Sequence, residues 1–189
     1  SNNEYYNETQ TGYSTLETYF NELTDNDLST MMDDFWDAAA DVAGNVEDVS
    51  TRSTFLESGK TLVDGFQTIS EQLIAFRASL DTEITKSVSD INEITKQIAN
   101  LNVEIVKAEA GGASRVSAND LRDQREVLVK NLSSIMKINV NEEDNGSVTV
   151  AAGTRLLVYG DTDYELTTKT EVIDDLNVQV PVFVSDSTK

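Results

Sequence analysis

One apolar seam runs through the middle of the sequence. Between about residues 51 and 109, apolar side chains recur at steps of three, four or seven, the period of a helix that buries one face. A continuous helix over about 58 residues would be roughly 87 Å long at about 1.5 Å per residue. The seam therefore predicts a shaft and excludes an ordinary globular core helix. Its members are Phe55, Leu62, Phe66, Ile69, Leu73, Phe76, Leu80, Ile84, Ile91, Ile94, Ile98, Leu101 and Ile105.

The seam changes its heptad register once. Phe76, Leu80 and Ile84 follow one another at two four-residue steps, so Leu80 marks a shift between two registers. Such a stutter locally unwinds a supercoil. We therefore expect the supercoil of the shaft, and not the helix itself, to unwind locally near Leu80.

Two shorter helices are predicted before the shaft. The first covers residues 4–24, where apolar residues recur at helical steps. The second covers residues 29–43, with Ser29 as its N-cap and Gly44 at its end. This second helix is expected to bury Met32, Phe35, Trp36 and Ala39.

The ends of the shaft and of a return helix can also be assigned. Ser50 is the predicted N-cap of the shaft, which covers residues 51–109, because its hydroxyl can accept from an unpaired backbone N–H of the first turn. Gly111-Gly112 is predicted to reverse the chain, and a helix over residues 119–137 then packs antiparallel on the shaft. Candidate caps of this return helix are Ser117, Asn119 and Asp120, and its predicted inner face consists of Leu121, Arg125, Leu128, Leu132 and Ile135.

The return helix carries a charged motif on and beside its inner face. The run Asp120-Leu121-Arg122-Asp123-Gln124-Arg125 places Arg125 where a leucine would ordinarily lie. A buried arginine needs an acidic partner or backbone carbonyls. Arg125 is therefore predicted to clamp the short helix to the shaft or to the following hairpin, with partner binding as the alternative. Arg122 is counted to the outer face, where substitution should be tolerated.

The period of the sequence changes to two after Lys137. Ile138, Val140, Val148 and Val150 alternate around Asp144-Asn145-Gly146, which predicts a β-hairpin with a type I′ turn. Further strands are expected at 156–159, 164–166 and 178–184. The only proline, Pro181, assigns the last of these to a sheet edge because it cannot donate a ladder hydrogen bond.

Together these patterns predict an α+β fold that is mainly α. Residues 1–137 would form an elongated antiparallel helical rod. Residues 138–189 would form the hairpin and the start of an outer β domain. With 39% apolar and 25% charged residues, the chain can build a core of elongated form.

Composition excludes several classes of function. The formal net charge is -20, and residues 1–50 hold twelve acidic residues and no Lys or Arg, so binding to nucleic acid or to an anionic membrane is disfavoured. No apolar run reaches the roughly 20 residues of a membrane span. Without His or Cys, histidine-based catalysis, disulfides and the usual zinc sites are excluded. These absences remove most hydrolase chemistry, and we predict no cofactor and no bound metal.

The remaining chemical signals are better explained by structure. The paired carboxylates at Asp33-Asp34, Glu142-Glu143 and Asp174-Asp175 fit a solvated acidic surface, since adjacent residues point apart on a helix or strand. A glycosidase pair or a weak calcium loop is the alternative. Trp36 fits a helical core stripe better than a ligand pocket.

Four segments stand out as a set: Leu28 to Trp36, Asn45 to Arg52, Ile91 to Asn102 and Asp120 to Arg125. They resemble segments of the FlgK family, the first hook-associated proteins of bacterial flagella. They occur in the family's order, and Val46 stands where the family often has proline. The resemblance implies that this chain is a central fragment without the family's terminal segments, which form the inner tube.

The resemblance implies a structural protein of the flagellum that is not an enzyme. Such a protein is exported through the flagellar type III apparatus without a cleaved signal, and it acts outside the cell. It would join hook to filament by contacting the hook protein, the second junction protein and neighbouring copies of itself. The alternative is a secreted coiled-coil adhesin or phage-tail-like protein whose β part binds a host ligand.

The chain by itself is predicted to be mostly monomeric. The helices at 4–24 and 119–137 should fill the apolar seam internally and leave little of it for self-association. Sedimentation equilibrium at micromolar concentration checks this. A stable dimer or a larger ring would contradict the prediction.

Overall fold

The computed structural model describes residues 10, 13–14, 16–18, 28–110, 115–173 and 175–186. Two compact units are present, one within residues 6–79 and one that contains residues 80–189. Helix α3, Val49–Ala110, has 62 residues and takes part in both units. The helix expected at 4–24 lies mostly outside the described residues.

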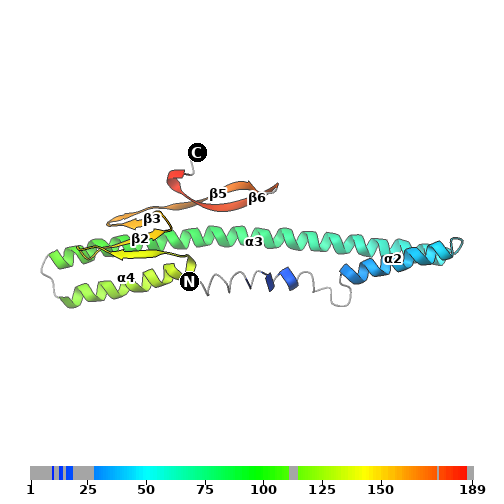
Figure 1. Ribbon diagram of the computed structural model, residues 1–189, viewed down its shortest axis with the longest axis horizontal. Coiled ribbons are helices and arrows are strands. Elements are labelled where there is room, and N and C mark those ends of the chain that lie inside the picture. Colours follow the sequence, from blue (N-terminus) through cyan, green and yellow to red (C-terminus); the bar gives the residue numbers. More distant parts are fainter. Residues whose placement is uncertain are drawn as a thin grey trace. The chain divides into compact units, whose positions relative to one another are not determined.

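In the first unit, helix α2, Leu28–Gly44, packs along the first part of α3 (Figure 1). The ring centroids of Phe35 and Phe55 are 5.1 Å apart. A Cβ added at Gly65 would lie 2.5 Å from the Met31 sulfur, so the two helices approach closely at this glycine. Met31 and Ala38 are buried, which places the contact face at steps of four and three around Phe35.

The predicted core face of α2 was wrong at two of its four residues. Phe35 contacts α3 and Ala39 is half-buried, as predicted, but Met32 and Trp36 are exposed. Met32 is 41% exposed and Trp36 is 63% exposed. The sequence holds two adjacent apolar pairs, Met31-Met32 and Phe35-Trp36, and the first member of each pair faces α3. Trp36 packs edge-on against Phe35, with ring centroids 5.4 Å apart.

Asp48, and not Ser50, caps α3. The Ser50 backbone N–H donates to Asp48 Oδ1 at 2.7 Å, which satisfies one of the unpaired donors of the first turn. The helix begins at Val49, so Ser50 already lies inside it. The predicted cap was wrong because the carboxylate two residues earlier takes that role.

Of the thirteen predicted seam residues of α3, four are buried, seven are half-buried and two are exposed. Ile69, Ile91, Ile98 and Ile105 are buried. Phe66 and Leu80 are 51% and 41% exposed and do not belong to the core. Three polar or small residues in the second half of α3, Thr95, Ala99 and Asn102, are also buried.

In the second unit, helix α4, Arg115–Ile135, runs beside the second half of α3 (Figure 1). Arg125 and Leu132 are buried, and Leu121, Leu128 and Ile135 are half-buried, so the inner face is the one the sequence predicted. The helix begins four residues before the predicted start. Ser117, Asn119 and Asp120 are therefore helical residues and not caps, and the Gly111-Gly112 reversal lies outside the described residues.

Four short antiparallel strands form a meander in the order β1-β2-β3-β4. A register shift between Val150 and Ala151 lets both Leu157 and Val158 of β3 be buried. The inner side chains join Ile98, Ala99 and Leu132 in one core. The strands are β1, Asn139–Glu142; β2, Val148–Ala152; β3, Arg155–Tyr159; and β4, Thr162–Asp163.

Strands β5, Leu166–Ile173, and β6, Leu176–Phe183, form a separate two-stranded sheet. Pro181 pairs with Thr168, and β6 pairs with β5 alone among the described strands, so the proline lies on an edge strand as predicted. A short 3-10 helix, Val184–Asp186, follows.

The predicted α+β class is confirmed. The predicted division at residue 137 coincides with the change from helix to strand. The boundary between the compact units lies elsewhere, between residues 79 and 80 within α3. The strands belong with the second half of α3 because their apolar faces share a core with it.

The contact face of α2 can be tested with two neighbouring methionines. Met31→Ala should lower the free energy of unfolding by about 2–3 kcal/mol, because a buried side chain is lost from the contact with α3. Met32→Ala should change it by about 0.5 kcal/mol or less, because that side chain is largely exposed. Urea unfolding of both variants provides the comparison. A larger effect at Met32 would restore the face predicted from the sequence.

Candidate functional site

Asn102 lies buried in the second half of α3 and joins three segments of the chain. Its side-chain Nδ2 donates to the carbonyl oxygens of Val148 at 2.8 Å and Gly160 at 2.9 Å. Its Oδ1 accepts from the Val148 N–H at 2.9 Å and from Arg125 Nη1 at 2.9 Å. An amide has two donors and about two acceptor positions, so all of them are used. The side chain is 1% exposed, and these bonds offset the cost of burying it.

Asn102 binds Val148 as a neighbouring strand would. One side-chain amide takes both the N–H and the C=O of the first residue of β2. The backbone groups at this end of the strand would otherwise be buried without partners. The helix thereby sets where β2 begins.

Arg125 extends this cluster to α4 and to the hairpin turn. Its Nη1 donates to Asn102 Oδ1 and, at 2.8 Å, to the Gly146 carbonyl oxygen, while Nη2 lies 3.8 Å from Glu142 Oε1. Arg125 is 5% exposed, so it is buried as the sequence predicted. Burial is the main reason that the pKa of Arg125 is lowered, and the nearby charge of Arg122 lowers it further. An arginine nevertheless remains a cation at neutral pH.

Arg122 lies at the rim of the same cluster. Its Nε and Nη2 donate to Glu109 Oε1 at 3.0 and 2.7 Å, and Nη1 donates to Glu142 Oε1. These hydrogen bonds, first to Glu109 and then to Glu142, raise the pKa of Arg122. Its predicted place on the outer, solvent-facing side was wrong, because the long side chain reaches from the flank of α4 to carboxylates on α3 and β1.

The hairpin turn differs from the predicted type I′ turn. The Gly146 N–H donates to the Glu143 carbonyl oxygen at 2.9 Å, and the Glu143 N–H donates to the Ser147 carbonyl oxygen at 2.9 Å. Gly146 has φ of 82°, whereas Asn145 is not among the residues with positive φ. Asp144 and Asn145 therefore form the centre of a type I turn, and Gly146 makes the bulge that follows. Asn145 Oδ1 accepts from the backbone N–H and the hydroxyl of Ser147 at 3.0 and 2.7 Å.

The backbone angle of Gly146 favours glycine, and a larger residue there would also have to displace the ends of two ion-paired side chains. A Cβ at this position would lie 2.5 Å from Glu109 Oε2 and 2.9 Å from Arg122 Nη2. The backbone of the turn therefore lies directly against the ion pair. We call Asn102, Arg122, Arg125, Glu109, Glu142 and Gly146 the polar clamp.

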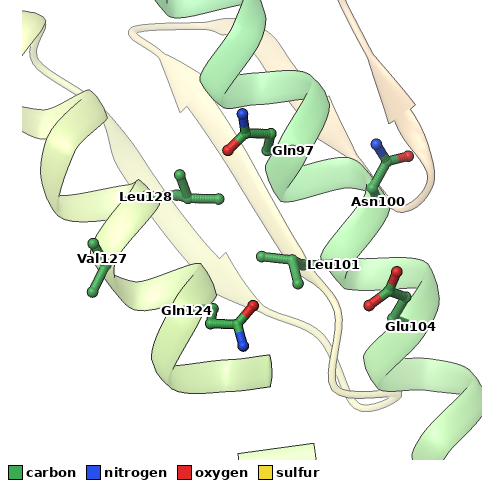
Figure 2. Close-up of a pocket in the computed structure, with 7 residues that line it drawn as sticks. All are labelled: Gln97, Asn100, Leu101, Glu104, Gln124, Val127 and Leu128. Carbon is green, nitrogen blue, oxygen red and sulfur yellow. The ribbon is translucent and has the colours of Figure 1, made fainter. Parts of the chain in front are cut away.

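The other residues of the predicted motif lie outside the polar clamp. Asp120, Asp123, Gln124 and Asp144 are exposed. Gln124 lies at a groove of about 480 Å³ between α3 and α4 (Figure 2). The roles of these residues stay predictions. The groove is lined by Gln97, Asn100, Leu101, Glu104, Gln124, Val127 and Leu128.

Two further side chains of α3 hold strands in the same manner. Asn92 Nδ2 donates to the Leu166 carbonyl oxygen at 2.8 Å, and its Oδ1 accepts from the Leu166 N–H at 2.9 Å. Asp81 Oδ1 accepts from the Gln179 N–H at 2.9 Å. The steps from Asp81 to Asn92 and on to Asn102 are each close to three helical turns, so the three residues share one face. The roles of Asp81, Asn92 and Asn102 were not predicted from the sequence, although their regular spacing along α3 is visible there.

Comparison with known proteins places this arrangement in a family. The family model described as flagellar hook-associated protein FlgK helical domain matches residues 13–189. The chain belongs to the FlgK family. Flagellar hook-associated protein 1 of Bacillus subtilis is 30% identical over 148 residues, which are 78% of this chain and 29% of that protein. Its counterpart in Escherichia coli is 35% identical over 141 residues, covering 74% of this chain and 25% of that protein.

A solved FlgK structure has the same fold. The flagellar hook junction protein FlgK from Burkholderia pseudomallei matches with a TM-score of 0.75 and 28% sequence identity. The match covers 92% of this chain and 31% of that one. This chain thus spans less than a third of the length of these FlgK relatives.

The described part of the chain contains neither a cluster of metal ligands nor a membrane-spanning helix. Among the residues that the structure describes, no three His, Cys, Asp or Glu side chains are grouped as metal ligands. Within the same residues, no helix is both long enough and apolar enough to cross a bilayer. Among the residues that the structure describes, Arg125 of the polar clamp is the charged residue that is buried.

The two arginines of the polar clamp should differ in their contribution to stability. Arg125→Ala should lower the free energy of unfolding by on the order of 2–4 kcal/mol, because Asn102 Oδ1 and the Gly146 carbonyl oxygen lose a buried donor. Arg122→Ala should cost about 0.5–1 kcal/mol, because its ion pairs are partly exposed.

Urea unfolding at low and high salt measures both contributions. Added salt should shrink the effect of Arg122→Ala and leave that of Arg125→Ala nearly unchanged. Equal losses at low salt would show that the buried hydrogen bonds of Arg125 add little beyond a surface ion pair.

Proposed function

We propose that this chain is the helical part of a structural adaptor that joins hook to filament in the bacterial flagellum. The observation that carries the proposal is the match of the FlgK helical-domain model to residues 13–189. The similarity to the solved structure of a flagellar hook junction protein supports the same role. The adaptor contacts the hook protein, the second junction protein and neighbouring copies of itself.

The internal bonding suits a part that transmits force and performs no chemistry. Three side chains of α3 bind the backbones of β2, β5 and β6, and the polar clamp ties α4 and the hairpin turn to the same helix. Buried hydrogen bonds of this kind resist sliding because each has a fixed geometry. The charged side chains of the polar clamp are used in these links, which supports a non-enzymatic role.

The proposal includes the place of action. The protein works outside the cell as part of the flagellum and is exported without a cleaved signal peptide. The comparisons give no support to the alternative of a coiled-coil adhesin or a phage-tail-like binding protein.

Deletion of the gene that encodes this chain should leave hooks intact and remove attached filaments. Two lattices of different subunits cannot meet without an adaptor, so flagellin should appear in the culture medium. Electron microscopy of the cells and immunoblotting of the medium check this, and a plasmid copy of the gene should restore filaments. Normal filaments on the deletion strain would refute the adaptor role.

A further inference from the structure

Asn145-Gly146 is the one Asn-Gly pair in the sequence, and it is chemically labile. In a flexible chain, the backbone nitrogen after an asparagine can attack the side-chain carbonyl carbon of that asparagine. Glycine favours this attack because it has no side chain to obstruct the approach and leaves the backbone free to rotate.

The reaction conserves all atoms with water as its only co-reactant. The deprotonated Gly146 nitrogen forms a bond to Asn145 Cγ, the Cγ–Nδ2 bond breaks, and ammonia leaves with a proton. Water then opens the resulting five-membered imide at one of its two carbonyl carbons. The product is aspartate, or isoaspartate with the backbone routed through the side chain.

The folded turn opposes each requirement of this reaction. The Gly146 N–H is buried and donates to the Glu143 carbonyl oxygen at 2.9 Å, so it is not available for deprotonation. Asn145 Oδ1 is held by the N–H and hydroxyl of Ser147. In the second central position of a type I turn, ψ is about 0°, which turns the next nitrogen away from the side chain.

We propose that Asn145 is a site of spontaneous deamidation that folding suppresses and that is open to reaction in the unfolded chain. Replacing Gly146 is costly, because its φ of 82° strains residues with a side chain and a Cβ would push the ends of Glu109 and Arg122 aside. The labile pair is thus retained, and the hydrogen bonds of the turn protect it.

The two products have different structural consequences. Aspartate keeps a side-chain oxygen that accepts from Ser147, so the turn can still form. Isoaspartate adds a methylene group to the backbone between residues 145 and 146. That extra length displaces the Gly146 carbonyl oxygen from Arg125 Nη1, to which it now bonds at 2.8 Å. A chain that has formed isoaspartate therefore cannot close the polar clamp.

The test compares the folded chain with the same chain in denaturing urea at neutral pH and 37 °C. Trypsin releases residues 138–155 as one peptide, in which mass spectrometry detects the gain of one mass unit at Asn145. Asn139 and Asn141 in this peptide are internal controls, because valine and glutamate follow them. Deamidation of Asn145 should be at least about tenfold slower in the folded chain, since it must wait for local opening. Equal rates in the two states would overturn the proposal.

A refolding experiment compares the effects of the two products on stability. Chains aged in urea are returned to native buffer, and the isoaspartate and aspartate forms are compared with an Asn145→Asp variant. The aspartate form and the variant should unfold at nearly the urea concentration of the unmodified chain, whereas the isoaspartate form should unfold at a clearly lower one. An isoaspartate form as stable as the unmodified chain would refute the proposed block of the polar clamp.

Discussion

A single buried amide, that of Asn102, fixes how the elements of the second unit are placed relative to one another. It meets β2, the Gly160 turn and Arg125 at the same time, with every donor and acceptor position in use. The apolar core around it supplies most of the burial energy, but hydrophobic contacts have no direction. The amide supplies the direction, because each of its bonds requires one particular backbone atom. The positions of α4 and of the hairpin turn follow from that requirement through Arg125.

Helix α3 acts as a template for strands that belong to different sheets. Asn92 and Asn102 each bind both backbone polar groups of the first residue in a strand, and Asp81 binds one backbone N–H of β6. A two-stranded sheet such as β5-β6 is marginally stable in water by itself. Attachment to a long helix gives it a fixed support that its own hydrogen bonds cannot provide.

Periodicity in the sequence was sufficient to predict the elements and several of their buried faces. It placed the long helix, the return helix with Arg125 on its inner face, and the first hairpin. It failed on α2, because Met31-Met32 and Phe35-Trp36 offer two faces of nearly equal apolar character. Only the approach to Gly65 and Phe55 decides between those faces.

The polar contacts were less accessible from sequence than the apolar ones. Arg125 could be predicted to need a carbonyl partner, but Asn102 as its second partner depends on two helices lying side by side. Arg122 was misplaced because a long side chain reaches well beyond the face from which it starts. The turn type was misjudged because Asn-Gly fits two hairpin geometries, and the hydrogen bond from Gly146 to Glu143 selects the one with the bulge.

The two hydrogen bonds between Asn102 and the backbone of Val148 also fix the register of β2. A slip of β2 by one residue would turn its N–H and C=O groups to the opposite edge and move Val150 from the core to solvent. The amide and the guanidinium would then be buried without partners, at a cost of several kcal/mol. The polar clamp therefore makes a misregistered hairpin much less stable than the native one.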